Sequence, residues 1–304
     1  MFKGKNMSDK SNNGKESTLI YHGSLFLAVL IWSTTFVNIK IVINEVPPNT
    51  LAFLRFLVAS IVLVVFFMIR HQPRIPQKDW LQVIIGGLAG VTLYNILQNQ
   101  GLRYAGATEA AILTSISPVF MVLFAWALLK ERPKVRQLVG IGAAFVGSVL
   151  VSTNGHIGDL ALDFLRLYGD ALMLLTAVAW AGYSISIKPL LEKYPPVSVL
   201  TYCTVAGTLF LVPVFLLDNP ANLKEISFIG WLNVFYLGIL ASAFAYLLWN
   251  TALKKVAVTT AAAYIYLLPV LSAFFAALVL HETITVYIVI GGLVVLAGTY
   301  FASE

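Results

Sequence analysis

The sequence contains little charge and a single cysteine. Charged residues make up 11% of the 304 residues, less than half of the roughly 25% typical of soluble proteins. Cys203 alone cannot form an internal disulfide, and no Cys/His cluster has the spacing of a zinc site. The chain also lacks a P-loop. These absences exclude a disulfide scaffold and an ATP-driven pump contained in one chain, and no cofactor is expected.

Long apolar runs dominate the sequence instead. Hydrophobic residues make up 59% of the chain, and the mean hydropathy is +0.85. A membrane helix needs about 20 apolar residues, and ten runs of about that length occur, too long and continuous for barrel strands. The sequence therefore predicts an all-α membrane protein with ten transmembrane helices, at residues 21–42, 50–69, 80–101, 108–129, 135–151, 168–188, 197–217, 228–253, 259–280 and 286–301.

The net charge of +6 reflects membrane topology. Cytoplasmic loops of membrane proteins retain lysine and arginine. With the N-terminus inside, 15 of the 20 Lys and Arg residues fall on inner segments and four on outer loops, while Arg55 lies within a span. We therefore expect a multi-pass protein of the cytoplasmic (plasma) membrane with both termini in the cytoplasm. No basic face is interleaved with aromatics, so no nucleic-acid partner is expected.

The two halves of the sequence resemble each other. Residues that recur 148 positions later include Trp32 (as Trp180), Lys40 (as Lys188) and Pro47 (as Pro195). Further along, a shift of 151 pairs Asn99, Pro118, Glu131 and Gly140 with Asn250, Pro269, Glu282 and Gly291. The similarity predicts two five-helix repeats, residues 18–151 and 168–304, joined by a connecting loop at 152–167. A polar segment at 1–17 is expected to be a disordered cytoplasmic tail.

The two predicted repeats have opposite orientations in the membrane. Because five is odd, the second copy enters from the other side, and a pseudo-two-fold axis in the membrane plane relates the copies. Such an inverted 5+5 repeat can pack in two nearly equivalent ways, one open to each side. A duplication retained only for folding is the alternative. The pattern favours transport by alternating access, with a substrate site between the copies near mid-membrane.

Several segments carry a resemblance to a known family. They include IWSTTFVNIK, PPNTLAFLRF, ISPVFMVLFAWALLKERP and YLLWNTALKKVAVTTAAAYIYLLPVLSAFFAALVLHETIT. In their order, spacing and duplication, they resemble the EamA family of the drug/metabolite transporter (DMT) superfamily over nearly the whole chain. The resemblance implies a ten-helix bundle whose spans one, three, four, six, eight and nine surround a central cavity, with the fifth and tenth outside. It also implies secondary transport, commonly export, of small metabolites, amino acids or drugs. Ser33 and His281 depart from the family, which commonly has glycine at both places.

Polar groups inside spans are the first candidates for a substrate site, because they are costly in hydrocarbon. The third span places Thr92, Asn95 and Asn99 on one stripe. Amides donate and accept hydrogen bonds, so this stripe could bind a zwitterion or a polar metabolite. Interhelical hydrogen bonding that only holds the bundle together is the alternative.

Aromatic residues on the first, sixth, eighth and ninth predicted spans are candidates for an apolar cavity wall, since aromatic rings bind apolar groups and cations. Together with the amides, the expected cavity-lining residues are Trp32, Thr35, Asn95, Asn99, Trp180, Tyr183, Tyr246, Asn250 and Tyr264.

Two charged residues within spans are candidates for proton or charge coupling. Glu109 could exchange a proton or meet a cationic group, or it could simply stabilise a helix N-terminus. Arg55 could neutralise a carboxylate of a substrate or of the protein, or it could snorkel to the interface. Pro118 and Pro269 each remove one helical hydrogen bond, so they are candidates for kinks that act in gating or that only shape the bundle.

An intramembrane enzyme or a channel is the alternative function. An enzyme would need catalytic side chains clustered within spans, yet all four histidines lie at span ends or in loops; no enzyme is expected. A channel explains the inverted duplication less directly. The sequence therefore predicts a secondary active transporter, with export favoured, of a small organic solute such as an amino acid, metabolite or drug. Its expected partners are that solute, the lipid bilayer and, as a candidate coupling ion, the proton, and the chain is compatible with a monomer or a homodimer.

Overall fold

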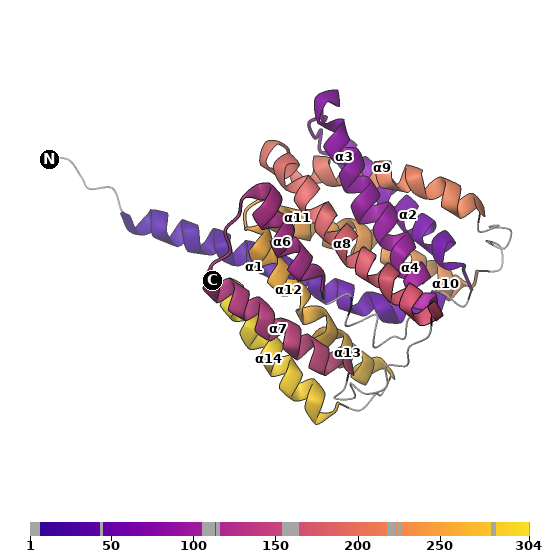
Figure 1. The fold of residues 1–304 in the computed structure, drawn as a ribbon. Helices are drawn as coiled ribbons and strands as arrows, with labels where there is room; N and C mark the ends of the chain where they lie inside the picture. The colour runs from indigo at the N-terminus through magenta and orange to yellow at the C-terminus, as the bar shows by residue number, and fades with distance from the viewer. Residues whose placement is uncertain are drawn as a thin grey trace.

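The chain folds into a bundle of helices (Figure 1). The computed structural model describes residues 7–42, 45–104, 113, 116–153, 164–217, 223, 226–280 and 284–303, and no strand occurs among them. The first half forms α1 (Met7–Val42), α2 (Pro48–Ile69), α3 (Trp80–Gly87), α4 (Tyr94–Tyr104), α6 (Ser117–Leu129) and α7 (Val135–Thr153). The second half forms α8 (Phe164–Lys193), α9 (Pro196–Leu217), α10 (Phe228–Tyr236), α11 (Ala245–Leu253), α12 (Val258–Ile265), α13 (Leu267–Leu280) and α14 (Val286–Ser303). The all-α prediction is confirmed.

Most of the predicted spans are long and apolar enough to cross a bilayer. Within the described residues, six helical segments meet that requirement: Pro48–Ile69, Gln77–Gly101, Leu167–Lys193, Pro196–Leu217, Phe228–Leu253 and Val258–Phe275. Four shorter apolar helices lie at Leu19–Thr35, Ser117–Leu129, Val135–Val151 and Val286–Ala302. These four overlap the other four predicted spans. That they also cross the membrane remains a prediction from the sequence.

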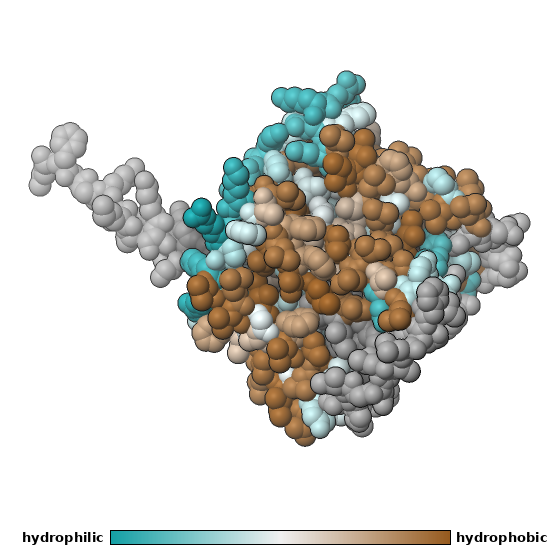
Figure 2. Space-filling model, viewed as in Figure 1, coloured by the Kyte–Doolittle hydropathy of each residue, from teal (hydrophilic) through white to brown (hydrophobic). Residues whose placement is uncertain are grey.

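The surface of the bundle is apolar where a lipid-facing surface is expected. Large hydrophobic side chains point outward on several helices, among them Ile61, Val65, Leu138, Val139, Phe228 and Leu293. Figure 2 shows a broad hydrophobic surface, with hydrophilic residues gathered towards the α2–α3 and α6–α7 connections. A water-soluble protein rarely exposes a contiguous apolar surface of this extent. The arrangement is that of a multi-pass membrane protein.

Helix α1 begins earlier than its apolar run. It starts at Met7 and extends away from the bundle (Figure 1). The structure gives residues 7–17 as part of this helix, and the disorder expected of the tail over residues 1–17 remains a prediction. Once the packed part of a helix has formed, each further turn adds hydrogen bonds without a new nucleation cost, so a polar extension can continue the helix.

The third and eighth spans each contain a π-helical segment. The 3-10 turn η1 (Gln77–Asp79) precedes α3, and η2 (Leu88–Leu93) separates α3 from α4. In the second half, η4 (Leu237–Phe244) separates α10 from α11. The shift of 151 residues places η2 within η4. Because a π-helical turn disturbs the regular ladder of backbone hydrogen bonds, it can leave carbonyl groups available to side chains.

Contacts between the fifth and tenth spans reveal the symmetry of the bundle. A Cβ atom on Gly140 would lie 2.6 Å from the Gly298 carbonyl oxygen, and one on Gly147 would lie 2.7 Å from the Gly291 carbonyl oxygen. Since Gly140 corresponds to Gly291 and Gly147 to Gly298, exchanging the two halves reproduces both contacts. Helices α7 and α14 therefore cross antiparallel about a pseudo-two-fold axis, with backbones close enough to require glycine.

Candidate functional site: a cavity between the two halves

A cavity lies where the two halves of the chain meet. Its volume is about 60 Å³, room for a few water molecules but far less than the ~300–1,000 Å³ of pockets that hold drug-sized ligands. The lining residues are Trp32, Thr35, Ile39, Arg55, Tyr94, Gln98, Ser117, Thr176, Ala177, Trp180, Tyr246, Ile265 and Leu268. They come from the first four spans and from the sixth, eighth and ninth. The cavity must enlarge before it can admit a metabolite.

Aromatic rings from both halves form one wall of the cavity. Trp32 on α1 and Trp180 on α8 meet edge to face, with ring centroids 5.2 Å apart and planes at 89°. Tyr246 on α11 lies 5.4 Å from Trp32 and 5.6 Å from Trp180, and Tyr94 lies 5.4 Å from Trp180. Trp32 and Trp180 are equivalent residues of the two halves, so their contact marks the pseudo-two-fold axis inside the cavity.

The hydrogen bonds of the two tryptophans break this symmetry. Trp32 donates from Nε1 to the Ala241 carbonyl oxygen at 2.9 Å. The equivalent acceptor for Trp180 would be the Gly90 carbonyl. That carbonyl instead accepts a hydrogen bond from the Tyr246 hydroxyl at 3.3 Å. The buried Nε1 of Trp180 has no hydrogen-bond partner among the described residues. Ala241 and Gly90 lie in η4 and η2, so the π-helical segments supply both acceptors.

Among the described residues that line the cavity, Arg55 is the one that carries a charge. It lies on α2, is only 8% exposed, and donates from Nε to the Ser242 hydroxyl of η4. Its guanidinium carbon lies 5.2 Å from the centroid of the Phe56 ring. Arg55 thus points into the cavity and bonds across the two halves instead of snorkelling to the interface. The described residues include no carboxylate that pairs with it.

Four polar lining residues were not anticipated from the sequence: Tyr94, Gln98, Ser117 and Thr176. Gln98 donates from Nε2 to the Tyr94 hydroxyl at 3.2 Å. These two residues are four apart on α4, and their face adjoins that of Asn95 and Asn99. Helical spacing could have suggested either face. Which face meets the cavity depends on the rotation of α4 about its own axis, which packing against other helices determines.

The amide stripe of the third span does not line the cavity. Asn95 donates to the Val91 carbonyl and Asn99 to the Pro48 carbonyl, each at 2.7 Å. Thr92 donates to the Gly207 carbonyl at 2.9 Å. These bonds satisfy the polar groups, and two of them join the third span to α2 and α9. These contacts fit the structural role that the sequence left as the alternative, and substrate binding by the stripe remains a prediction.

Tyr183, Asn250 and Tyr264 also lie outside the cavity lining. Tyr183 donates to Asn250 Oδ1 at 3.0 Å, and its ring lies 5.4 Å from that of Trp180. These two buried residues therefore form a layer behind the aromatic wall. The Tyr264 hydroxyl hydrogen-bonds with Nδ1 of His22 at 2.7 Å. Of the nine expected lining residues, the cavity brings together Trp32, Thr35, Trp180 and Tyr246.

Each of the two candidate kink prolines lies just after a helix interruption. Pro118 is in the first turn of α6, and Pro269 is the third residue of α13. The preceding turns carry 3-10 hydrogen bonds, from the Ile116 amide to the Leu113 carbonyl and from the Tyr266 amide to the Ala263 carbonyl. The structure thus shows a helix interruption before each proline, whereas a kink that acts in gating remains a prediction. Glu109 lies outside the described residues, and its coupling role also remains a prediction.

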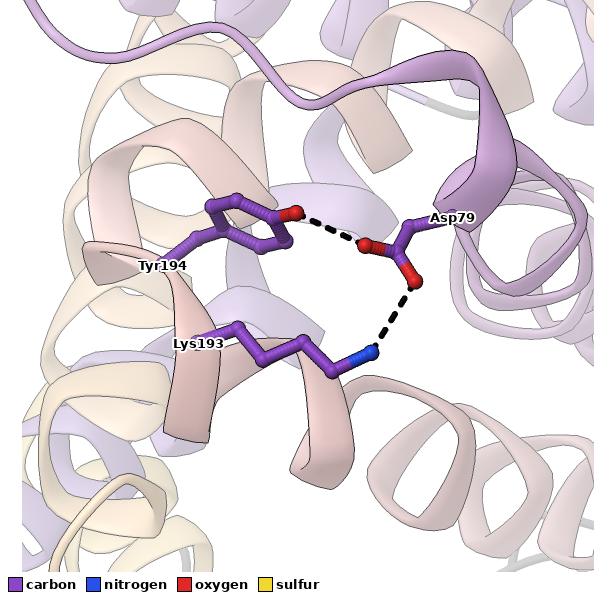
Figure 3. Close-up of polar contacts among 3 residues, drawn as sticks. All are labelled: Asp79, Lys193 and Tyr194. Atoms are coloured by element: carbon purple, nitrogen blue, oxygen red, sulfur yellow. Dashed lines mark hydrogen bonds and ion pairs between the residues drawn. The ribbon is translucent and has the colours of Figure 1, made fainter.

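A polar network ties the two halves together at one end of the bundle (Figure 3). The Asp79 carboxylate of η1 accepts from Lys193 Nζ at 3.0 Å and from the Tyr194 hydroxyl at 2.7 Å. Lys254 donates to the Tyr194 carbonyl at 3.0 Å. The bond to Asp79 raises the pKa of the Tyr194 hydroxyl, because ionisation would remove the donor and place two anions side by side. Tyr194 therefore stays a donor near neutral pH.

Further polar contacts reinforce the same end, which is the predicted cytoplasmic one. Lys188 donates to the Leu253 and Val256 carbonyls at 2.6 and 2.8 Å. Glu131 accepts from the first amides of α12, Val258 and Thr259, at 3.2 and 3.4 Å, where a carboxylate also suits the helix dipole. Among the described residues, no three His, Cys, Asp or Glu side chains come together to hold a metal ion.

Comparison with known proteins identifies the family. The EamA-like transporter family model matches residues 19–153 and again residues 167–303. An uncharacterized transporter of Archaeoglobus fulgidus is 36% identical over 93% of this chain and 96% of its own length. A Streptantibioticus cattleyicolor protein named "probable terminal-alkyne amino-acid exporter" is 28% identical, over 90% of each chain. One crystal structure shares the fold, with a TM-score of 0.80, 24% identity, and coverage of 95% of this chain and 96% of that one.

These matches define a membrane transporter of the drug/metabolite transporter superfamily. The chain belongs to the EamA-like transporter family. It is accordingly a transporter and not an enzyme, and the duplicated family match agrees with the two-fold arrangement of α7 and α14.

Proposed function

We propose that the protein is a secondary active transporter that exports a small organic solute by alternating access through the cavity between its two halves. The contact between Trp32 and Trp180 carries this proposal. Equivalent residues that meet on a pseudo-two-fold axis present nearly the same surface to both halves. A solute bound there can face either side of the membrane after a modest rotation of one half against the other.

The size of the cavity and the position of the polar network support alternating access. A cavity of about 60 Å³ holds only a few water molecules, which suits a closed site in a carrier better than an open aqueous pore. The contacts among Asp79, Lys193 and Tyr194 join the halves at the predicted cytoplasmic end. Opening that end requires these contacts to separate, which is the behaviour of a gate in a carrier.

Location, direction and solute class complete the proposal. The distribution of lysine and arginine supports the cytoplasmic membrane with both termini inside. Fusing a reporter active only in the cytoplasm to each terminus tests this orientation, and an active reporter is expected at both. The exporter name of the Streptantibioticus cattleyicolor relative supports outward movement and amino acids as one candidate solute class.

Mass-spectrometric profiling of cells and medium tests the proposed function. Cells that express the intact chain are expected to enrich a small solute outside, whereas cells with Trp32→Ala or Trp180→Ala at the same level are not. Trp126→Ala is the matched control, because Trp126 is 58% exposed on α6 and does not line the cavity. Equal enrichment of the solute outside cells with the intact chain and cells with Trp32→Ala would show that the solute does not pass through this cavity. If the reconstituted intact protein also moves none of these solutes outward in an efflux assay, the export proposal fails.

Proton coupling through Glu109 is a separable part of the proposal. We expect Glu109→Gln to lose flux driven by a pH gradient while retaining exchange of solute across the membrane. Intact pH-driven flux in that variant would rule out this coupling role without affecting the carrier mechanism. Electrical recording separates a carrier from a channel, since channel flux per molecule would exceed carrier flux by orders of magnitude.

A further inference from the structure

The positive charge of Arg55 has no counter-charge among the described residues of the cavity. Arg55 is 8% exposed and lines the cavity, and the described residues place no carboxylate against it. Keeping an arginine in a membrane-spanning helix is costly unless an anion or several acceptors compensate it. Its one hydrogen bond to the described residues runs from Nε to Ser242. The terminal amino groups of the guanidinium therefore have no hydrogen-bond partner among the described residues.

Ser242 orients the guanidinium group. It belongs to the π-helical segment η4 of the second half, whereas Arg55 belongs to α2 of the first half. A bond at Nε holds the planar group by its inner edge and leaves the outer N–H groups free. That outer fork matches the two oxygens of a carboxylate in a bidentate geometry.

The pseudo-symmetry supplies no second charge. The counterparts of Arg55 and Ser242 are Cys203 and Val91, both 1% exposed. These positions are neutral and packed, so the described lining of the cavity carries one positive charge in total. A single carboxylate balances that charge, whereas a doubly charged phosphate would leave excess charge in a region of low dielectric.

The rest of the lining suits an apolar or aromatic body. Trp32, Trp180 and Tyr246 present ring edges and faces, and Ile39, Ile265 and Leu268 complete the apolar surface. Aromatic rings of this kind pack against flat or branched apolar groups.

We propose that Arg55 is the substrate-binding residue of the cavity and that the transported solute carries one carboxylate on an apolar or aromatic body. This inference rests on the proposed transport function and adds the substrate class to it. The solute carboxylate takes the outer fork of Arg55 while its body packs on the wall formed by Trp32, Trp180 and Tyr246. Amino acids with apolar side chains fall within the class through the same carboxylate.

Three probes of similar size test the charge requirement in the purified full-length protein. These are 3-phenylpropionate, its neutral amide 3-phenylpropionamide, and the cation 2-phenylethylamine. Quenching of tryptophan fluorescence reports binding, because Trp32 and Trp180 lie in the cavity. We expect the carboxylate to bind about tenfold or more tightly than either of the other probes, the range of a charge-assisted hydrogen bond. Equal or tighter binding of the amide or the amine, or no binding of any probe, overturns the proposal.

Variants of Arg55 assign the preference to this residue. Arg55→Gln is expected to abolish the preference for 3-phenylpropionate over the amide, and Arg55→Lys to retain it with weaker binding, because lysine keeps the charge but not the fork. Arg74→Gln is the matched control, since Arg74 is exposed in the α2–α3 connection. An unchanged preference in Arg55→Gln overturns the proposal. Because the preference is a ratio measured on folded protein that still binds the amide, a loss of stability alone cannot produce the expected result.

This test and the test of transport fail independently. If profiling shows export of a solute without a carboxylate, the transport proposal stands and the Arg55 proposal fails. If the protein binds 3-phenylpropionate through Arg55 but moves no solute, binding by Arg55 stands and the transport proposal fails.

Discussion

Ser60 and Thr208 occupy the same place in the two halves and hydrogen-bond to each other. Their hydroxyl oxygens lie 2.9 Å apart. Ser60 lies on α2 and Thr208 on α9, and the repeat shift of 148 residues separates them in the sequence. Only residues on a two-fold axis can touch their own counterparts. Together with the contact between Trp32 and Trp180, this bond marks the pseudo-two-fold axis that relates the two halves.

The Ser60–Thr208 bond leads to an asymmetric prediction. Thr208 also donates to the Thr204 carbonyl at 2.7 Å, whereas Ser60 has Thr208 as its one hydrogen-bond partner among the described residues. Thr208→Val leaves a buried hydroxyl unpaired and should cost about 1–3 kcal/mol, whereas Ser60→Ala should cost about 1 kcal/mol. The double variant should be less destabilised than the sum of the two. Unfolding in detergent measures all three, and additive effects would contradict the pairing.

Helices α7 and α14 provide a matched glycine pair. Gly147→Val places a side chain 2.7 Å from the Gly291 carbonyl, whereas Gly142 has no heavy atom within 4 Å of its Cβ position. We expect Gly147→Val to lose about 1–3 kcal/mol of stability through overpacking and Gly142→Val to be nearly neutral. Thermal unfolding of the two variants, made in parallel, checks the difference. Similar melting of both would mean that α7 and α14 do not pack in this register in the membrane.

The two tryptophans should respond differently to replacement by phenylalanine. Trp32→Phe removes the bond from Nε1 to the Ala241 carbonyl and should cost about 0.5–1.5 kcal/mol beyond the loss of ring area. Trp180→Phe removes a buried N–H that has no partner among the described residues, so this part of the cost should be absent. Comparing the unfolding free energies of the two variants tests this. A larger loss for Trp180→Phe would indicate a partner for Trp180 in the membrane-embedded protein.

The contact among Asp79, Lys193 and Tyr194 should control access from the predicted cytoplasmic side. A Thr176→Cys reporter places a thiol in the cavity lining, and the buried Cys203 contributes little background. We expect Asp79→Ala to increase the rate at which a maleimide labels this reporter from the cytoplasmic side several-fold, because the halves separate more readily there.

Two further variants bear on that prediction. Exchanging the charges, with Asp79→Lys and Lys193→Asp together, should restore slow labelling. Glu192→Gln alters an exposed neighbouring charge and should have no effect. Unchanged labelling in Asp79→Ala would show that other contacts, such as those of Lys188 with the Leu253 and Val256 carbonyls, keep this end closed.

The candidate site was only partly predictable from the sequence. Trp32, Trp180 and Tyr246 were expected in the cavity wall, and the structure places them there. Asn95 and Asn99 were expected beside them, but their amides bond to backbone carbonyls. Polar side chains on a membrane helix need hydrogen-bond partners, and neighbouring backbone carbonyls can supply them as well as a solute can. The rotation of α4 about its own axis turns Tyr94 and Gln98 towards the cavity. That rotation depends on packing between helices that are far apart in the sequence.

Apolar length and internal similarity are local properties of the chain, and by themselves they determined the membrane class, the helical spans and the duplication. Each apolar run must satisfy its backbone hydrogen bonds internally, so its helical structure does not depend on its neighbours. Tertiary structure alone decided the π-helical segments, the meeting of equivalent residues on the axis, and the bond from Arg55 to Ser242. The contacts among these features join residues about 150 or more positions apart in the sequence. They form only when the two halves pack against each other.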